Sequence, residues 1–195
     1  MMDMRLTDAD DAPDEALLVR YANGDAQAAR GLTLRLGPRA FSQAFRMLGD
    51  RAEAEDVAQE ALLRLWKIAP DWRQGEAKVT TWLYRVVANL CTDRLRRARN
   101  VTLDRVPEPE DDRAGPAERL QNRARADALQ SALASLPERQ RQAVVLRHIE
   151  GLANPQIAEI LEISTEAVES LTARGKRSLT QILAGRRTEL GYHDD

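Results

Sequence analysis

The sequence predicts an all-α protein with two small helical domains joined by a flexible acidic linker. Apolar residues recur at three- and four-residue steps over most of residues 14–100 and 117–187, which is the period of a helix with one buried face. No segment shows the alternating apolar and polar pattern of a strand. Residues 101–116 combine prolines, a glycine and an acidic cluster, so they have little to bury and predict the linker.

Charge is distributed unevenly along the 195 residues. The chain is 43% hydrophobic and 31% charged, with a net charge of −2, so its overall balance does not indicate a nucleic-acid partner. The acidic side chains gather at residues 1–15 and 104–112, whereas basic side chains gather at residues 85–99 and 174–187. This segregation suits a protein that contacts an anionic polymer through some of its surfaces only.

Several classes of site are not expected. Cys91 is the single cysteine, so no intrachain disulfide can form and a reducing compartment is expected. His148 and His193 have no cluster of ligands around them, so we expect no metal and no cofactor. No apolar run approaches the roughly eighteen residues of a membrane span. We therefore expect a soluble, cytoplasmic protein without membrane insertion and, because no acid–base or nucleophilic set is present, no enzymatic activity.

The first half predicts five helices. They are expected over Asp14–Tyr21, from the cap Asp25 to a break at Gly37-Pro38, over Arg39–Leu48, over Arg51–Ile68, and over Val79–Arg99 after a loop at residues 71–78. The second half predicts helices over Ala117–Leu136 and Pro137–His148, and then two more that begin at the N-caps Asn154 and Ser164.

The helix predicted over Val79–Arg99 combines a buried stripe with a basic end. Trp82 and Tyr84 lie in its first turns, and five arginines stand against Asp93 over residues 85–99. The apolar stripe is formed by Leu83, Val86, Val87, Leu90 and Leu95. Aromatic side chains can stack on bases and cations can hold phosphates. An ordinary amphipathic helix with a solvated basic face is an equally good interpretation of this segment alone.

Residues 154–177 have the form of a helix-turn-helix. A short helix, a tight apolar turn at Ile163 and a capped second helix follow one another, and the second helix carries Arg174, Lys176 and Arg177. In such a motif the second helix enters the major groove while basic residues hold phosphates. A plain helical hairpin within a bundle is the alternative.

Two segments resemble a known family. LPERQRQAVVLRHIEGLANPQIAEILEISTEAVES (136–170) resembles the promoter-binding domain of bacterial RNA polymerase sigma factors, and the extracytoplasmic-function (ECF) group fits best. GDRAEAEDVAQEALLRLW (49–66) and TTWLYRVVANLCTDRLRR (80–97) resemble the first conserved domain of the same group. The resemblance implies sigma region 2 at residues 14–100 and region 4 at residues 117–187.

The resemblance also implies partners. They are core RNA polymerase, through its β′ clamp and β subunits, promoter DNA, and a cognate anti-sigma factor. The chain would then direct promoter-specific initiation and catalyse nothing itself. A stand-alone helix-turn-helix regulator is the alternative function, and a protein that only sequesters partners is a third.

Three sets of site residues follow from the resemblance. Polymerase binding is expected at Asp56, Gln59, Glu60 and Arg64. Recognition and melting of the −10 element are expected at Trp82, Arg85, Val86, Asn89, Arg96, Arg97 and Arg99. Recognition of the −35 element is expected at Thr165, Glu166, Glu169, Ser170, Arg174, Lys176 and Arg177. Asn89 is the best candidate to read a base, because its amide both donates and accepts hydrogen bonds.

The chain departs from the family pattern at four positions. Leu83 stands where housekeeping relatives carry a second tryptophan, which suggests weaker melting and greater dependence on promoter sequence. Glu169 and Leu171 stand where relatives commonly carry Lys or Arg, and Thr172 replaces a usual core leucine. Either −35 recognition shifts to Arg174, Lys176 and Arg177, or this helix face serves another contact.

Overall fold

The computed structural model describes residues 12–73, 75, 78–100 and 116–185, and all regular elements in these residues are helical. The first domain contains α2 (Asp14–Ala22), α3 (Ala26–Leu48), α4 (Arg51–Ile68), η1 (Ala69–Asp71) and α5 (Val79–Asn100). The second contains α6 (Pro116–Ala134), α7 (Glu138–Val144), η2 (Val145–Ile149), α8 (Asn154–Leu161) and α9 (Thr165–Ala184). The all-α prediction is confirmed. The linker predicted at residues 101–116 lies almost wholly outside the described residues.

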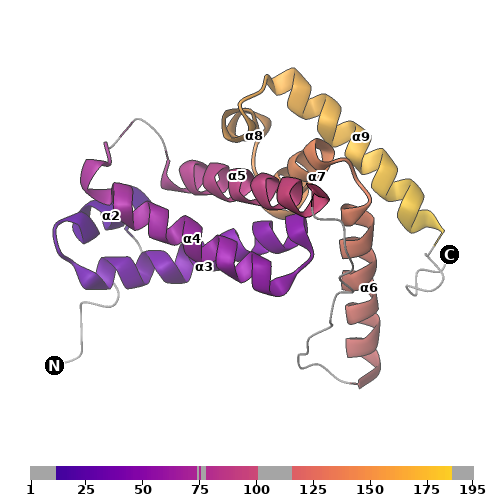
Figure 1. Ribbon diagram of the computed structural model, residues 1–195, viewed down its shortest axis with the longest axis horizontal. Coiled ribbons are helices and arrows are strands. Elements are labelled where there is room, and N and C mark those ends of the chain that lie inside the picture. The colour runs from indigo at the N-terminus through magenta and orange to yellow at the C-terminus, as the bar shows by residue number, and fades with distance from the viewer. Residues whose placement is uncertain (1–11, 74, 76–77, 101–115, 186–195) are drawn as a thin grey trace.

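The two domains lie side by side along α5 (Figure 1). Helices α2, α3 and α4 pack on one side of α5, and α7 and α8 lie on its other side. Helix α6 and helix α9 form the far end of the molecule. Among the described residues, no helix is both long enough and apolar enough to cross a membrane.

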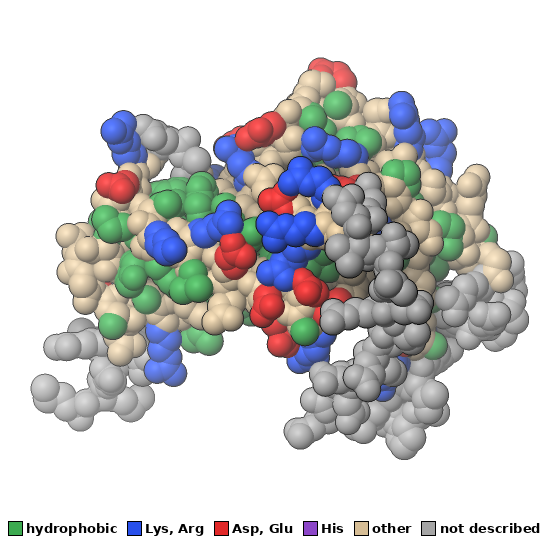
Figure 2. All heavy atoms as spheres, viewed as in Figure 1, with side chains coloured by type: hydrophobic (Ala, Val, Ile, Leu, Met, Phe, Trp, Pro, Cys, Tyr) green, Lys and Arg blue, Asp and Glu red, His purple; other side chains and the backbone are tan. Residues whose placement is uncertain are grey.

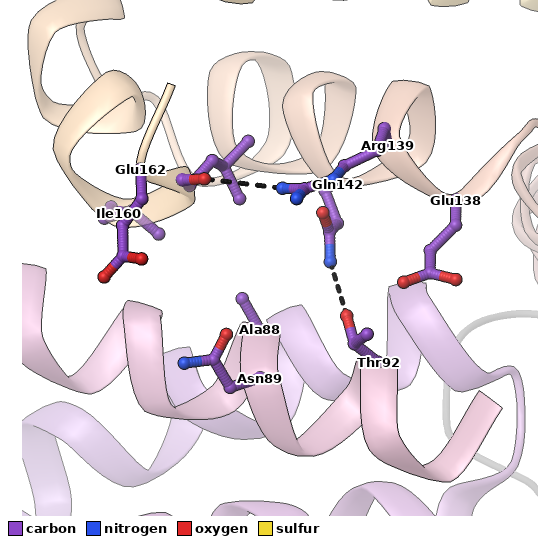
Figure 3. Close-up of a pocket in the computed structure, with 9 residues that line it drawn as sticks. Ala88, Asn89, Thr92, Glu138, Arg139, Gln142, Ile160 and Glu162 are labelled. Atoms are coloured by element: carbon purple, nitrogen blue, oxygen red, sulfur yellow. Dashed lines mark hydrogen bonds between the residues drawn. The ribbon is translucent and has the colours of Figure 1, made fainter. Parts of the chain in front are cut away.

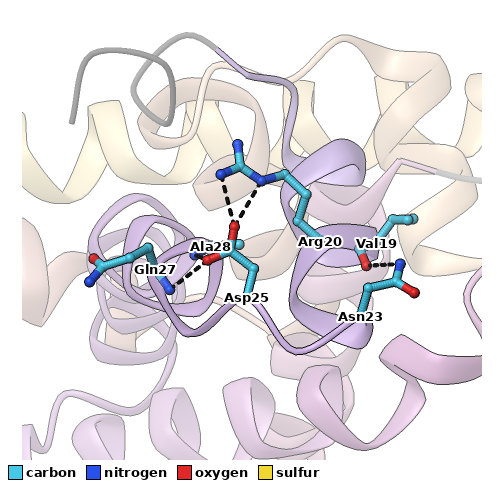
Figure 4. Close-up of polar contacts among 6 residues, drawn as sticks. All are labelled: Val19, Arg20, Asn23, Asp25, Gln27 and Ala28. Atoms are coloured by element: carbon cyan, nitrogen blue, oxygen red, sulfur yellow. Dashed lines mark hydrogen bonds and ion pairs between the residues drawn. The ribbon is translucent and has the colours of Figure 1, made fainter. Parts of the chain in front are cut away.

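Side-chain caps set the starts of the first long helices. The Asp25 carboxylate accepts hydrogen bonds from the backbone N–H groups of Gln27 (2.9 Å) and Ala28 (3.3 Å) at the start of α3. Arg20 also donates to Asp25 (Figure 4), and this bond is the main reason that the pKa of Asp25 is lowered. Asp50 caps α4 in the same way, through the N–H of Glu53 at 2.9 Å. These bonds satisfy amides that have no partner inside the helix.

The break predicted at Gly37-Pro38 is wrong, because α3 continues through both residues. Proline removes the hydrogen bond to the carbonyl of Leu34. Leu34 is 68% exposed and Pro38 is also exposed, so water can satisfy that carbonyl. The buried stripe continues without interruption on the opposite face, through Leu32, Leu36, Ala40, Ala44 and Met47. Tertiary packing of this stripe outweighs the local cost of the proline.

The helix predicted over Pro137–His148 changes character halfway. Regular α-helix ends at Val144, and the next turn, η2, is a π-helix. The N–H of Glu150 donates to the carbonyl of Val145, five residues back, at 3.0 Å. A wider turn of this kind changes the direction in which the following side chains point. Glu150 consequently faces the first domain, where its carboxylate meets Ser42 and Tyr84.

The helix-turn-helix is present, with one correction to its caps. Ser164 caps α9 as predicted, and its hydroxyl accepts the N–H of Ala167 at 3.2 Å. Asn154 is not the cap of α8: it is the first helical residue, and Ala153 occupies the cap position. The N–H of Ala153 is satisfied instead by the side chain of Gln156, at 3.0 Å. Glu162 makes the turn between the helices with a φ of 54°.

Candidate nucleic-acid interface

The aromatic side chain at the start of α5 is packed against another tryptophan. Trp82 is half-buried, and its ring meets Trp72 edge-to-face at 6.5 Å between centroids. Leu83 is 1% exposed and belongs to the core of the first domain. Because Leu83 is buried, its side chain is not available to contact DNA bases. The aromatic neighbour of Trp82 is instead Trp72, which was not among the predicted site residues. Its position in the loop, ten residues before Trp82, was the available signal.

The middle of α5 is covered by the second domain. Arg85 is half-buried and donates to the backbone carbonyl of Glu159 in α8 at 3.0 Å. Its guanidinium also lies 3.8 Å from the carboxylates of Glu159 and Glu162. Val86 is half-buried against the core of the first domain. Among the −10 residues predicted in this stretch, Asn89 is the exposed one.

Asn89 faces a small pocket between α5, α7 and α8 (Figure 3). The pocket has a volume of about 140 Å³. Across it, the Gln142 amide donates to the Thr92 hydroxyl at 2.9 Å, which joins α7 to α5. The pocket walls therefore come from both domains, and a change in domain arrangement would open it.

Part of the basic end of α5 is paired with neighbouring acids. Arg94 pairs with Glu53 and lies 3.9 Å from the Glu60 carboxylate, so it ties α5 to α4. Arg96 pairs with Asp93 at 2.9 Å. Arg97 is exposed, and the side chain of Arg99 lies outside the described residues. Two arginines of this end, Arg94 and Arg96, are thus paired within the molecule.

The polar side of α4 contains both exposed and paired residues. Asp56, Gln59 and Arg64 are exposed, and Arg64 also pairs with the half-buried Glu60 at 2.5 Å. Leu63 is 52% exposed on the same helix, and Figure 2 shows hydrophobic side chains gathered on this part of the molecule. Sequence reasoning missed Leu63, although it lies outside the helical stripe of buried positions and could have been found for that reason.

The basic side chains of helix α9 are exposed to solvent. Arg174, Lys176 and Arg177 are exposed, and none forms an ion pair with another residue that the structure describes. Closer to the start of the helix, Glu166 and Glu169 are exposed while Thr165 and Ser170 are half-buried. Leu171 packs against the core of the second domain, so this position is not available for phosphate contact. The predicted −35 residues thus share one helix, with their positive charge in its second half.

Two buried titratable side chains, Cys91 and Tyr84, have raised pKa values. Cys91 is buried, and burial raises the pKa of its thiol to about 12. Burial is likewise the main cause that raises the pKa of Tyr84, and the nearby Glu150 carboxylate adds to it. Across the described ranges, no three His, Cys, Asp or Glu side chains are grouped so that they could hold a metal ion.

Comparison with known families identifies both domains. Residues 32–101 match Sigma-70 region 2, and residues 126–179 match Sigma-70, region 4. The chain is 34% identical over 157 residues to the ECF RNA polymerase sigma factor SigE of Mycolicibacterium smegmatis, covering 77% of this chain and 60% of that protein. It is 33% identical to the ECF sigma factor SigM of Mycobacterium tuberculosis, covering 87% and 84%. It is 32% identical to the sigma factor NccH of Alcaligenes xylosoxydans xylosoxydans, covering 89% and 96%.

Solved structures agree with these matches. CnrH, in complex with the cytosolic domain of CnrY, is 27% identical with a TM-score of 0.65, over 88% of this chain and 97% of that one. The sigma factor RpoE of Bartonella quintana, in complex with the anti-sigma factor NepR, shares the fold with a TM-score of 0.64 at 20% identity, over 80% and 96%. Sigma factors bind core RNA polymerase and promoter DNA to direct transcription initiation. The two matched regions, in this order and with full-length relatives, show that the chain belongs to the ECF group of RNA polymerase sigma factors.

Proposed function

We propose that this sigma factor contacts core polymerase through α4, the −10 element through α5 and the −35 element through α9. The exposed cations of α9 carry this proposal most directly, because Arg174, Lys176 and Arg177 lie on the capped second helix of the helix-turn-helix. Phosphate contacts from such residues set the position of a recognition helix on DNA.

The polymerase contact is proposed at the exposed positions of α4. Asp56 and Gln59 provide polar groups and Leu63 provides an apolar one. A coiled-coil clamp on the β′ subunit, with complementary charge, would suit this face. The pair Glu60–Arg64 would rearrange or remain at the rim of such an interface.

Promoter opening is proposed at the start of α5. Trp82 would stack on an unpaired base after leaving its contact with Trp72, and Arg85 and Asn89 would contact the upstream part of the −10 element. Recognition of the −35 element is proposed to centre on the basic second half of α9, because Glu169 cannot hold a phosphate and lies 3.5 Å from the Asn154 amide.

A cognate anti-sigma factor is proposed by analogy with CnrH, whose structure contains the cytosolic domain of CnrY. We further propose that the chain acts in the cytoplasm and performs no catalysis of its own, because the polymerase synthesises the RNA.

Run-off transcription with purified core polymerase tests the proposal. Promoter-specific transcripts should appear only when this protein is added. A variant with Asp56→Arg and Gln59→Ala should lose transcripts while keeping its melting temperature, whereas Asp127→Ala, at an exposed position of α6, serves as control. DNA binding without initiation by the wild-type protein would instead support a stand-alone regulator.

A further inference from the structure

We propose that Glu15 is a positioning residue for promoter opening. Its carboxylate reaches from α2 to the first residue of α5, Val79, and thereby fixes the part of α5 that carries Trp82. This inference rests on the proposed function of α5 in opening the −10 element. Glu15 acts through Val79 and does not itself contact DNA.

The start of α5 has no side-chain acceptor at its cap position. The residue directly before the helix is Lys78, whose side chain has only hydrogen-bond donors, and the first turn of α5 contains no acidic residue. By contrast, Asp25, Asp50 and Ser164 each cap a helix from the position directly before it. The first amides of α5 therefore need an acceptor from another part of the chain.

Glu15 supplies this acceptor. Its Oε1 accepts the backbone N–H of Val79 at 3.0 Å, although the two residues are 64 positions apart in the sequence. Val79 is 0% exposed, so water has no access to it in the structure. A carboxylate at a helix N-terminus also complements the partial positive charge there. Loss of Glu15 would leave a buried donor without its partner, which is destabilising.

Helix α2 is a firm support for this contact. Leu17 and Leu18 of α2 are fully buried in the core of the first domain. The ring of Tyr21 lies 4.8 Å from the ring of Trp66 in α4, measured between centroids. Helix α2 also packs against η1, the short helix directly before Trp72 (Figure 1). It therefore supports both the segment that precedes Trp72 and the start of α5.

The two tryptophans are tied to these supported segments by their backbones. The N–H of Trp72 donates to the carbonyl of Ala69 in η1 at 3.2 Å, and the N–H of Trp82 donates to the carbonyl of Lys78 at 3.1 Å. Their rings meet edge-to-face at 6.5 Å between centroids. With the start of α5 fixed, Trp82 can exchange Trp72 for a base by rotation of its side chain, without movement of the helix.

A fixed backbone at Trp82 should matter most when the promoter is still double-stranded. A group that is already held in its binding position loses less conformational freedom when its ligand arrives. Taking a base out of a duplex costs free energy, because pairing and stacking are lost. If the start of α5 also had to become ordered at that moment, fewer promoters would open. On DNA whose bases are already unpaired, the same defect should have little effect.

Hydrogen exchange of the full-length chain measures the contact itself. Glu15→Ala should accelerate exchange of the Val79 amide roughly five- to thirtyfold, as expected when a buried N–H loses a charged acceptor. Asp14→Ala is the matched control. It removes the neighbouring carboxylate of α2, which pairs with Arg35 of α3 at 3.2 Å, and should leave the exchange of Val79 unchanged.

Run-off transcription on two templates measures the consequence for promoter opening. One template is a duplex promoter, and the other carries mismatches that leave its −10 element already unpaired. Glu15→Ala should reduce transcripts from the duplex about fivefold, and from the unpaired template by no more than about twofold. Glu15→Gln keeps an acceptor oxygen but loses the charge, so it should lie between the wild type and Glu15→Ala. Asp14→Ala should keep the wild-type ratio of the two templates.

Two outcomes would overturn the inference. Unchanged exchange of Val79 in Glu15→Ala would show that the carboxylate does not hold the start of α5. Faster exchange together with an equal loss on both templates, or with no loss on either, would show that the contact supports the fold but not promoter opening. Should Glu15→Ala fail to fold, Glu15→Gln decides both measurements. Absence of transcripts from the wild-type protein on either template would contradict the proposed function and the role of Glu15 with it, whereas the exchange rates report the contact alone.

Discussion

Helices α5 and α9 both carry basic side chains, yet these cations have different surroundings. On α5, Arg85 is covered by α8, and Arg94 and Arg96 pair with acidic side chains. On α9, Arg174 and Arg177 are exposed without an ion pair to any other described residue. The number of basic residues along a helix therefore overstates how many cations of α5 are free to contact a phosphate. For α9, the same count agrees with the number of exposed cations.

The difference follows from where each helix lies. Helix α5 runs through the middle of the molecule and packs against α3, α4 and α8 (Figure 1), so acids on its neighbours can reach its arginines. Helix α9 lies at the edge of the second domain and packs mainly on α6, α7 and α8. One side of α9 consequently remains open to solvent. Four experiments would test this comparison.

The largest effect is expected at Gly175, where α9 crosses α7. A Cβ atom at this position would lie 2.5 Å from Val144 Cγ2 and 3.3 Å from the carbonyl oxygen of Gln140. We expect Gly175→Val to lower the free energy of unfolding by about 3 kcal/mol, because backbone and a buried side chain must shift. Urea unfolding measures this, and Gly185→Val, where the added Cβ meets no atom within 4 Å, is the control. Equal stability of both variants would mean that α9 is not held at this crossing.

The exposed cations of α9 should dominate DNA binding. Replacing Arg174 and Arg177 together by alanine should reduce the slope of log affinity against log salt by about 1.8, since each phosphate contact contributes about 0.9. Arg96→Ala should change the slope by less than half as much, because Asp93 already neutralises Arg96. Fluorescence anisotropy with promoter DNA measures both slopes, and an equal change in the two variants would contradict the comparison.

Removing the acid that neutralises Arg94 should make α5 more like α9. Glu53→Gln leaves Arg94 with a weaker partner, Glu60, at 3.9 Å. We expect DNA affinity to rise a few-fold and the free energy of unfolding to fall by about 1 kcal/mol, which is typical of a partly exposed pair. Asp127→Asn also removes one negative charge but releases no arginine of α5, so it separates the local effect from the change in net charge. Identical affinity of the two variants would show that Arg94 gains no access to DNA.

The smallest effect concerns His148, next to α9. His148 is exposed, but partial desolvation by neighbouring atoms lowers its pKa, and the charges of Lys176 and Arg147 lower it further. The folded state therefore binds fewer protons than the unfolded state near and below the usual pKa of about 6.5, so stability should fall as pH drops through that value. His148→Gln should reduce this pH dependence of urea unfolding between pH 7.5 and 5.5. An NMR titration of His148 that gave a raised pKa would contradict this prediction.

Local patterns in the sequence predict several elements well. Helix α4 begins and ends at the predicted residues, Arg51 and Ile68, because Asp50 caps it and its apolar period is regular. The start of α5 at Val79 and the Ser164 cap of α9 are also confirmed. These features depend on residues within a few positions of one another, so hydrogen bonding and periodicity in the chain itself suffice to identify them.

Other features depend on residues that are far apart in the sequence. Pro38 remains inside α3 because a buried stripe outweighs its missing hydrogen bond, and Gly175 is required by α7, which packs directly against it although it lies about 30 residues earlier in the chain. Glu150 looks like an ordinary polar residue in the sequence, but it joins Ser42 and Tyr84 in the structure. No periodicity can reveal such partners, because they are set by which surfaces meet.

The sequence by itself determined the helical class, most helix boundaries, the helix-turn-helix and the resemblance to sigma factors, since these are recorded in short-range patterns of apolar, capping and basic residues. The tertiary structure alone decided which predicted contact residues are exposed. It places Arg174 and Arg177 in solvent, buries Tyr84, and covers Arg85 with α8. The physical reason is that burial and ion pairing depend on the neighbouring domain, whereas helix formation depends mainly on the chain nearby.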